Sequence, residues 1–409
     1  MESKKISIQA SVMWNSIGSI FYLGCQWLLT VLVVRIAGVD TAGTLSLAMS
    51  VCNIWYCISV YGMRNFQVSD TQNKYENGTY IFSRYLTSVA ALVGCLIYIL
   101  VIGYDWEQRI CILLYFLFKF SEALFDVYAG IFQKEWRLDY AGKSMLIRGV
   151  LSITVFTGFL YVTNLVTAIA GMAVVCLAEV LTFDVFHARR ITSISLNRSI
   201  SKVKALLVEC FPLLVYTLLS SIIGTIPRLF MERILGNYEL GIYGSVATPT
   251  LIIQMAATYV FNPFVTLFAE RYHQKDKQKF MRAFLNCTLA VAVISVAGII
   301  GGKLLGKWVL NLLYGVEIAA HVELLVPLII CTVLTAFSWL LCGILTAIRE
   351  FKGLVVGNLL AVIVSTLLSM PCEKQYGMQG ASIALAVAVV VEIIVLFLYM
   401  MKRIKKQFS

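Results

Sequence analysis

The amino-acid sequence predicts an all-α polytopic membrane protein with twelve transmembrane helices in two six-helix lobes. Its composition, the recurrence of long apolar runs and a repeated turn motif support this fold class. Hydrophobic residues make up 60% of the 409 residues and charged residues only 13%, and the mean hydropathy is +0.84. Soluble domains are about 45–50% apolar and about 25% charged. The composition therefore places most of the chain in a lipid bilayer.

Apolar runs recur from Ser11 almost to the C-terminus. A helix of about 20 apolar residues crosses the roughly 30 Å of hydrocarbon in a bilayer. The first run is too long for the hydrophobic region of a signal peptide, so we expect it to be retained. We predict twelve spans, at residues 11–36, 43–63, 83–104, 110–131, 144–163, 165–186, 206–233, 241–267, 283–305, 323–348, 354–372 and 381–401.

The distribution of Lys and Arg predicts the orientation, because cytoplasmic loops retain positive charge. With both termini in the cytoplasm, 25 of the 33 Lys and Arg fall on the cytoplasmic side, Arg64 and Arg84 among them. Lys119 is the cation that we place near the middle of the membrane. The net charge of +11 is then explained by topology and anionic inner-leaflet lipid. No nucleic-acid-binding motif accompanies the basic residues, so we expect no nucleic-acid partner.

A repeated turn indicates that the chain arose by duplication. Arg35-Ile-Ala-Gly38-Val-Asp-Thr-Ala-Gly43 recurs as Arg233-Ile-Leu-Gly236-Asn-Tyr-Glu-Leu-Gly241, each time between the first and second spans of a half. We therefore expect an N-terminal lobe at 1–188, a basic cytoplasmic linker at 189–204 and a C-terminal lobe at 205–409. Because six is even, both halves enter the membrane in the same direction. This predicts a pseudo-two-fold axis along the membrane normal.

All six prolines lie in the second half of the sequence. Pro212 and Pro227 interrupt the span at 206–233, where each removes a backbone hydrogen bond and favours a kink. The kink is either a hinge that opens a gate or a static bend, which membrane helices tolerate well. We take Pro212 and Pro227 as candidate hinge residues.

Polar residues recur at helical spacing along one face of each of the first two spans. Such stripes either pack against neighbouring helices or line water. The stripes comprise Asn15, Ser19, Tyr22, Gln26 and Thr30 in the first span, and Ser46, Ser50, Asn53, Cys57 and Tyr61 in the second. From these, Asn15, Tyr22, Gln26 and Asn53 are our candidates to bind a substrate in a polar cavity.

The span at 110–131 carries Lys119, Glu122 and Asp126 at positions i, i+3 and i+7, on one helical face. An unpaired charge at the middle of a bilayer is costly and usually functional. One interpretation is that Lys119 meets an anionic substrate while Glu122 or Asp126 titrates or binds a coupling cation. The alternative is a Lys119–Glu122 pair that serves only packing.

Other charges within spans have less distinctive patterns. Arg148 and Glu179 lie at similar predicted depth, which favours a structural ion pair. Arg228 is placed with Glu232 at i, i+4, as a snorkelling pair or as a cation of the cavity. Glu392 lies midway along the last span, and the sequence names no partner for it. The eleven Cys and three His show no metal-ligand spacing, so we expect no metal site.

With these features the chain resembles the polysaccharide-transporter branch of the multidrug/oligosaccharidyl-lipid/polysaccharide exporter superfamily, which includes O-antigen and capsule repeat-unit flippases. The resemblance covers essentially the whole length. Besides the repeated turns, it rests on Leu312-Leu-Tyr-Gly315 followed by Ala319-Ala320, and on Tyr376-Gly-Met-Gln-Gly380-Ala-Ser.

The resemblance implies a MATE-like fold, with two lobes around a V-shaped cavity, in the bacterial inner membrane. It implies transport of an undecaprenyl-pyrophosphate-linked oligosaccharide from the inner to the outer leaflet by alternating access. No cofactor is expected beyond H⁺ or Na⁺ as a coupling ion. Beyond the bilayer, the expected partners are a polysaccharide polymerase and the chain-length machinery.

The physical chemistry of such a substrate agrees with a polar cavity. A pyrophosphate and an oligosaccharide cannot cross hydrocarbon unaided, so cations and polar groups must replace water. Lys119, Arg228 and Arg35 are our candidates to bind the phosphate. A cation-coupled multidrug or small-solute exporter of the same fold stays open as an alternative. A membrane enzyme is disfavoured, because the sequence has neither a large outer loop nor an acidic catalytic motif.

Overall fold

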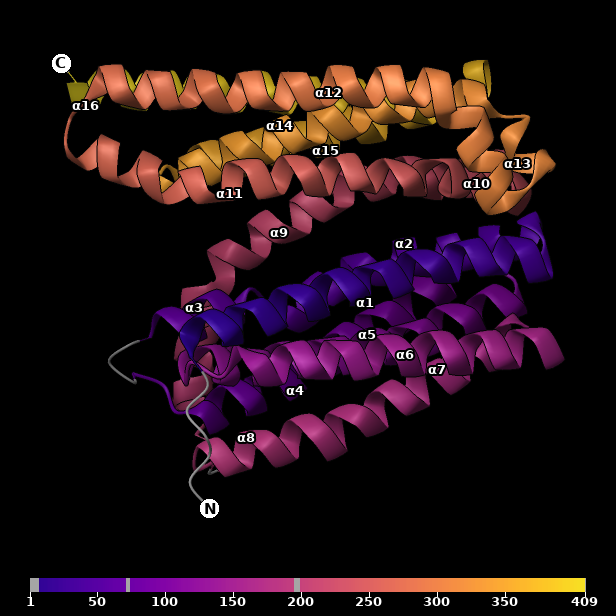
Figure 1. Ribbon diagram of the computed structural model, residues 1–409, viewed down its shortest axis with the longest axis horizontal. Coiled ribbons are helices and arrows are strands. Elements are labelled where there is room, and N and C mark those ends of the chain that lie inside the picture. The colour runs from indigo at the N-terminus through magenta and orange to yellow at the C-terminus, as the bar shows by residue number, and fades with distance from the viewer. Residues whose placement is uncertain (1–6, 71–73, 195–198, 409) are drawn as a thin grey trace. The chain divides into compact units, whose positions relative to one another are not determined.

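The computed structural model describes residues 7–70, 74–194 and 199–408 (Figure 1). These ranges are helical and contain no β-strand, which confirms the predicted all-α class. The chain divides into two compact units, Met1–Leu218 and Leu219–Ser409.

The first unit is made of long helices joined by shorter helical segments. They are α1 (Ile8–Ala37), α2 (Val39–Val60), α3 (Met63–Ser69), α4 (Asn77–Ile102), α5 (Trp106–Lys134), α6 (Leu138–Val162), α7 (Leu165–Glu179), the π-helical turn η1 (Val180–Asp184), α8 (Val185–Ile191) and the first part of α9 (Ile200–Ile234).

The second unit begins within α9. The helices that follow are α10 (Asn237–Ala247), the 3₁₀ turn η2 (Thr248–Thr250), α11 (Leu251–His273), α12 (Lys277–Tyr314), α13 (Val316–Ala319), the 3₁₀ turn η3 (Val322–Leu324), α14 (Leu325–Ala347), α15 (Phe351–Tyr376) and α16 (Met378–Phe408). The predicted span 241–267 is thus divided in two, with Pro249 inside the 3₁₀ turn. A proline there removes a helical hydrogen bond.

Eleven helical segments within the described ranges are long and apolar enough to cross a membrane. The twelfth predicted span corresponds to α5, which has 29 residues but carries Lys119, Glu122 and Asp126. A helix of that length covers about 43 Å, more than the hydrocarbon thickness. The chain is therefore a multi-pass membrane protein.

The surface of α12 shows how the bundle meets lipid. Leu285, Leu289, Val293, Val296 and Ile300 recur every three or four residues, and each is more than half exposed. This spacing forms one face of a helix. A continuous apolar face of this kind is unfavourable in water, so we assign it to contact with acyl chains.

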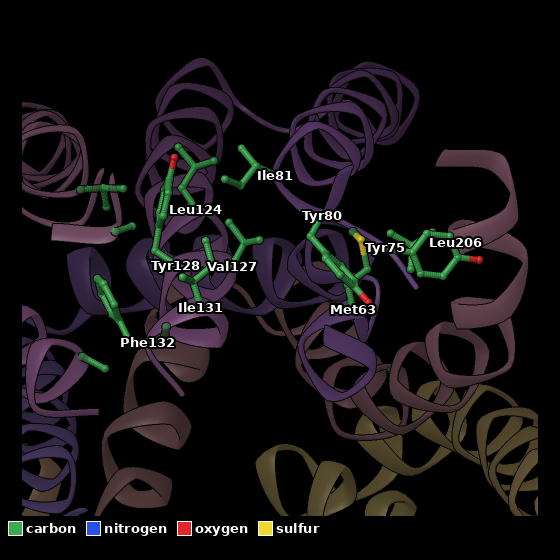
Figure 2. Close-up of a cluster of buried hydrophobic side chains, with 14 of the residues drawn as sticks. Met63, Tyr75, Tyr80, Ile81, Leu124, Val127, Tyr128, Ile131, Phe132 and Leu206 are labelled. Atoms are coloured by element: carbon green, nitrogen blue, oxygen red, sulfur yellow. The ribbon is translucent and has the colours of Figure 1, made fainter. Parts of the chain in front are cut away.

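Helix α5 lies at the centre of the first unit, where it packs against α2, α3, α4, α6 and α7. The half of α5 that contains Leu124, Tyr128 and Phe132 belongs to a buried hydrophobic cluster, which also includes Met63 of α3 and Tyr80 of α4 (Figure 2). Because α5 is surrounded by other helices, the charged face of α5 has to meet protein side chains.

The first part of α9 packs on the first unit. Leu206 and Cys210 of α9 belong to the same hydrophobic cluster. Lys202 forms an ion pair of 2.8 Å with Glu76, and Glu209 forms one of 2.5 Å with Lys74. These contacts explain why the division between the units falls after Leu218, within α9. The sequence instead placed the start of the second lobe at residue 205, after the basic segment 189–204.

The repeated turn motif has the same backbone conformation in both units. Gly38 joins α1 to α2 with φ 89° and ψ 174°, and Gly236 precedes α10 with φ 110° and ψ 178°. Gly315, between α12 and α13, adopts φ 99° and ψ 179°. This region of backbone space is essentially restricted to glycine. The glycine of each repeat is therefore required by the backbone, whereas Arg35 beside Gly38 is exposed.

We predict that Gly38→Ala destabilises the protein by about 1–3 kcal/mol, the usual cost of such a strained backbone conformation. Space is not the cause, because a Cβ at Gly38 would meet no atom within 4 Å. Gly24→Ala within α1 is the matched control, since a Cβ there also meets nothing and Ala is favoured over Gly in a helix. Thermal unfolding in detergent measures both. Equal unfolding temperatures for the two variants would contradict this explanation of the turn.

Candidate functional site

The candidate site is built on α5, whose ionisable residues face the interior of the first unit. The helix begins with a capping box, in which Asp105 caps the backbone at Gln108 and the Gln108 side chain caps Asp105. This arrangement satisfies N–H groups at the helix start and fixes the register of the helix. Lys119, Glu122 and Asp126 then lie along one face, but the structure gives them different partners.

Lys119 is held by one carboxylate and three aromatic rings. Its Nζ lies 2.6 Å from Oε2 of Glu122, and 5.2 Å, 5.8 Å and 5.7 Å from the ring centres of Tyr56, Tyr115 and Phe118. Aromatic faces attract a cation within about 6 Å. The Lys119 side chain is only 16% exposed. Its charge is therefore compensated within the first unit.

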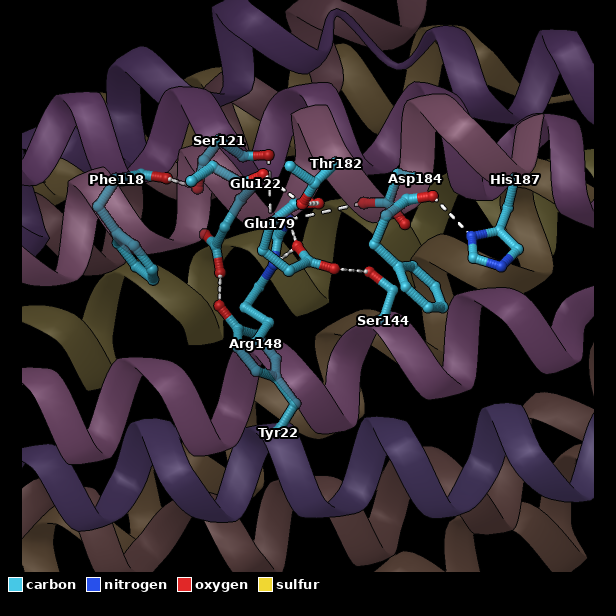
Figure 3. Close-up of polar contacts among 12 residues, drawn as sticks. Tyr22, Phe118, Ser121, Glu122, Ser144, Arg148, Glu179, Thr182, Asp184 and His187 are labelled. Carbon is cyan, nitrogen blue, oxygen red and sulfur yellow. Dashed lines mark hydrogen bonds and ion pairs between the residues drawn. The ribbon is translucent and has the colours of Figure 1, made fainter. Parts of the chain in front are cut away.

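Glu122 has a second partner in α1. The Tyr22 hydroxyl donates a hydrogen bond to Oε1 of Glu122 (Figure 3). Both carboxylate oxygens of Glu122 are thus engaged, one by Lys119 and one by Tyr22. The polar stripe of α1 meets α5 at this point.

Asp126 lies between two arginines. Its Oδ2 is 2.7 Å from Nη2 of Arg84, and its Oδ1 is 3.5 Å from Nη1 of Arg64. Arg84 is fully buried and also donates to the carbonyl oxygen of Ser59 at 2.9 Å. Arg64 is one-third exposed and donates to the side-chain carbonyl of Gln133 at 3.1 Å. Two guanidinium groups around one carboxylate leave this cluster with a net positive charge.

The role of Arg84 was not predicted from the sequence, which indicated only that this residue lies at the cytoplasmic side of its span. Helix α4 begins at Asn77, whereas the predicted span begins at residue 83. Arg84 therefore lies two turns inside the helix, with its side chain in the protein interior. Arg84 and Ser88 share one face of α4. This spacing is only a weak indication that Arg84 is buried, because α4 contains no acidic residue that could pair with it.

Arg148 of α6 and Glu179 of α7 form the ion pair expected from the sequence (Figure 3). Nη2 and Nε of Arg148 lie 2.8 Å and 3.3 Å from Oε2 of Glu179. Ser144 donates to the other carboxylate oxygen at 2.8 Å, and Arg148 also donates to the carbonyl oxygen of Ser121 at 3.4 Å. Both charged side chains are buried, so the pair ties α5, α6 and α7 together.

The remaining residues of the predicted polar stripes have different surroundings. Gln26 donates to the Ser152 hydroxyl at 3.4 Å, so Gln26 and Tyr22 both contact neighbouring helices of the first unit. Asn15 is half-buried, and Asn53 is exposed on α2. Ser19 of the same stripe donates to the Met145 sulfur of α6 at 3.5 Å, so the stripe of α1 contacts neighbouring helices at three positions. Asn53 is the substrate-binding candidate with an exposed side chain on α2.

Arg35 and Arg228, the other candidate phosphate ligands, lie elsewhere along the chain. Arg35 is exposed in the last turn of α1. Arg228 is half-buried in the part of α9 that belongs to the second unit. Pro212 and Pro227 both lie within α9, which continues as a helix through them, and the boundary between the units falls between the two prolines.

The second unit holds two buried carboxyl groups with few polar contacts. Glu373 of α15 is fully buried, and its oxygens accept no hydrogen bond from the described residues. Glu392 of α16 is 4% exposed and lies 3.8 Å from the sulfur of Cys342 in α14. The sequence singled out Glu392 from its depth in the last span. It missed Glu373 because that residue lies beyond the predicted span 354–372.

We predict that Arg84→Met and Arg64→Met have very different costs, although both arginines contact Asp126. Removing a buried partner from an ion pair costs about 3–5 kcal/mol, whereas an exposed pair contributes about 0–1 kcal/mol. Thermal unfolding in detergent should therefore show a large loss for Arg84→Met and a small one for Arg64→Met. Similar losses would mean that burial of Arg84 does not decide the strength of the cluster.

Comparison with known proteins places the chain in a family. The model of a family described as polysaccharide biosynthesis protein matches residues 32–323. Because the match covers well over half of the sequence, the chain belongs to this family. It is also similar to the capsular polysaccharide biosynthesis protein CapF of Staphylococcus aureus, with 24% identity over 383 residues that cover 93% of this chain and 96% of CapF.

Solved structures with the same fold include transporters of the MOP superfamily. An inward-facing multidrug resistance MATE transporter matches with a TM-score of 0.73 and 16% identity, over 97% of this chain and 98% of that one. The lipid II flippase MurJ, in an inward closed conformation, matches with a TM-score of 0.76 and 12% identity, over 97% and 90%. At these identities the likeness establishes the fold, which is MATE-like as the sequence predicted.

Proposed function

We propose that the protein is a flippase that moves an undecaprenyl-pyrophosphate-linked oligosaccharide repeat unit from the inner to the outer leaflet of the bacterial cytoplasmic membrane, by alternating access. The observation that carries this proposal is the family match over residues 32–323. The CapF relative is described by its role in capsular polysaccharide biosynthesis. A neighbour of the same fold is a lipid II flippase.

The charged face of α5 supplies chemistry suited to this substrate. We propose that Lys119 binds the pyrophosphate, with Arg35 and Arg228 as further cations. In the structure Lys119 is neutralised by Glu122 at 2.6 Å, so an arriving phosphate would compete with this carboxylate. Glu122, released from Lys119 but still hydrogen-bonded to Tyr22, would then bind a proton or Na⁺. Substrate binding and ion binding would in this way be linked through one ion pair.

Asp126 is a second candidate for ion coupling, but its surroundings differ from those of Glu122. Two arginines contact it, so each of its carboxylate oxygens already has a cationic partner. We therefore propose that Asp126 holds Arg84 and Arg64 in place, and that Glu122 is the carboxylate that leaves Lys119 to bind the coupling ion. Arg64, one-third exposed, adds a cation that an anionic lipid headgroup can reach.

A cation-coupled exporter of small molecules is the alternative function. The buried Glu373 and Glu392 of the second unit favour it, because acidic groups in an apolar interior attract cationic substrates or coupling ions. In either case we propose that both termini lie in the cytoplasm. A polysaccharide polymerase and the chain-length machinery are the protein partners that the flippase proposal implies.

Deletion of the gene tests the proposed substrate. Cells without the protein should accumulate the lipid-linked repeat unit in the inner leaflet, because the headgroup cannot cross hydrocarbon unaided. Accessibility of the oligosaccharide to an added impermeant enzyme, compared in inverted and right-side-out vesicles, measures the leaflet. Normal delivery to the outer leaflet in a strain without a redundant transporter would exclude the flippase function. Drug sensitivity without such accumulation would favour the exporter.

Lys119→Ala tests the proposed phosphate ligand. The loss of a hydrogen bond to a charged group costs about 1.5–3 kcal/mol, which corresponds to a roughly 10- to 100-fold loss of transport. Lys119→Arg should retain part of the activity, and Lys402→Ala, a change at an exposed lysine, is the matched control. Outer-leaflet delivery is measured at equal amounts of inserted protein. Unaltered delivery by Lys119→Ala would leave Lys119 with a packing role only.

A further inference from the structure

A π-helical turn brings two carboxylates of α7 and η1 onto the same arginine. Glu179 is the last residue of α7, and Asp184 is the last residue of η1, five positions later. In an α-helix of 3.6 residues per turn, such residues point about 140° apart. A π-helix bonds residue i to i+5, which aligns them. Isolated π turns are rare and occur frequently at functional sites.

Arg148 hydrogen-bonds to Glu179 but not to Asp184. Glu179 accepts from Nη2 and Nε of Arg148 and from the Ser144 hydroxyl. Oδ2 of Asp184 lies 3.8 Å from Nη2 of the same guanidinium, beyond hydrogen-bond distance. Neither oxygen of Asp184 accepts a hydrogen bond from the described part of the chain, although the side chain is fully buried. Figure 3 shows Glu179 between Arg148 and Ser144, with Asp184 beside them.

The other groups around Asp184 do not supply a second positive charge at contact distance. The charged groups that act on Asp184 most strongly are Glu179 on its own helix and Arg148 from α6. The Ser144 hydroxyl of α6 also lies near Asp184, although it donates its hydrogen bond to Glu179 at 2.8 Å. The Tyr128 phenol of α5 lies within electrostatic range of both Asp184 and Arg189 of α8. Within the described residues, Arg148 is the cation within 4 Å of Asp184. One guanidinium therefore faces two buried carboxyl groups.

We infer that the Glu179–Asp184 pair is a proton-binding site in the first unit, with the proton on Asp184. An ionised carboxylate buried without a hydrogen bond is very costly, and two carboxyl groups that share a site cannot both ionise easily. Glu179 accepts hydrogen bonds from three donors. Asp184 has none, and its protonated form removes the unmatched charge.

Proton release from Asp184 would require Arg148 to divide its hydrogen bonds between the two carboxylates. Arg148 also bonds to the Ser121 carbonyl of α5, one residue before Glu122. Protonation or deprotonation of Asp184 would thus change the contacts of Arg148 with the α5 backbone beside the Lys119–Glu122 pair. Asp184 would hold its proton whichever substrate the protein carries.

Infrared spectroscopy of the full-length protein in lipid vesicles tests the inference. At neutral pH, Asp184→Asn should remove one protonated-carboxyl C=O band that exchanges in D₂O. Asp40→Asn, at an exposed carboxylate in the first turn of α2, should leave that band unchanged. A full-strength band in Asp184→Asn would overturn the proposal. Because only the carboxyl band is measured, this outcome is separate from failure of the proposed transport function.

Thermal unfolding of two variants tests which carboxyl group carries the proton. Asp184→Asn replaces a neutral acid by a neutral amide of the same shape, so it should fold with little change in Tm. Glu179→Gln should lower Tm, and it should also remove the protonated-carboxyl band, because Asp184 then ionises to pair with Arg148. If Asp184→Asn failed to fold while Glu179→Gln was tolerated, the assignment of the proton to Asp184 would be wrong.

Discussion

Compensation of buried charge is the constraint on which the first unit depends. Helix α5 is enclosed by other helices and still carries Lys119, Glu122 and Asp126 along one face. Charges in an apolar interior are costly unless they are paired. Each of these residues has an opposite charge from its own or a neighbouring helix, at distances from 2.6 Å to 3.5 Å. The same contacts hold α5 to its neighbouring helices.

The two units share a turn but differ in chemistry. Gly38 and Gly236 adopt the same backbone conformation after equivalent helices, as expected of a duplicated chain. In the first unit, Asp126, Glu122 and Glu179 pair with Arg84, Lys119 and Arg148, respectively. In the second unit, Glu373 and Glu392 form no ion pair within the described residues. The ion pairs around α5 thus have no counterpart at the buried carboxyl groups Glu373 and Glu392 of the second unit.

Helical spacing predicted those features that depend on a single helix. The positions i, i+3 and i+7 were enough to place Lys119, Glu122 and Asp126 on one face, and the predicted depth was enough to pair Arg148 with Glu179. Contacts such as Arg84 with Asp126 depend on how α4 packs against α5, which no local pattern encodes. The π turn at 180–184 likewise changes which residues share a face. The α-helical repeat of 3.6 residues per turn therefore could not predict that Asp184 lies near Arg148. The position of the boundary between the units, inside α9, likewise depends on packing and not on composition.

We have proposed that the charged face of α5 binds a lipid that carries a pyrophosphate. The most direct measurement reconstitutes the purified protein in liposomes with two fluorescent lipids, an undecaprenyl-pyrophosphate oligosaccharide and the same oligosaccharide on undecaprenol without phosphate. Translocation is followed by quenching of the outer-leaflet fluorophore. We expect the protein to move the pyrophosphate-linked lipid much faster than the neutral lipid. Equal rates for the two lipids, or rates no higher than in protein-free liposomes, would contradict it.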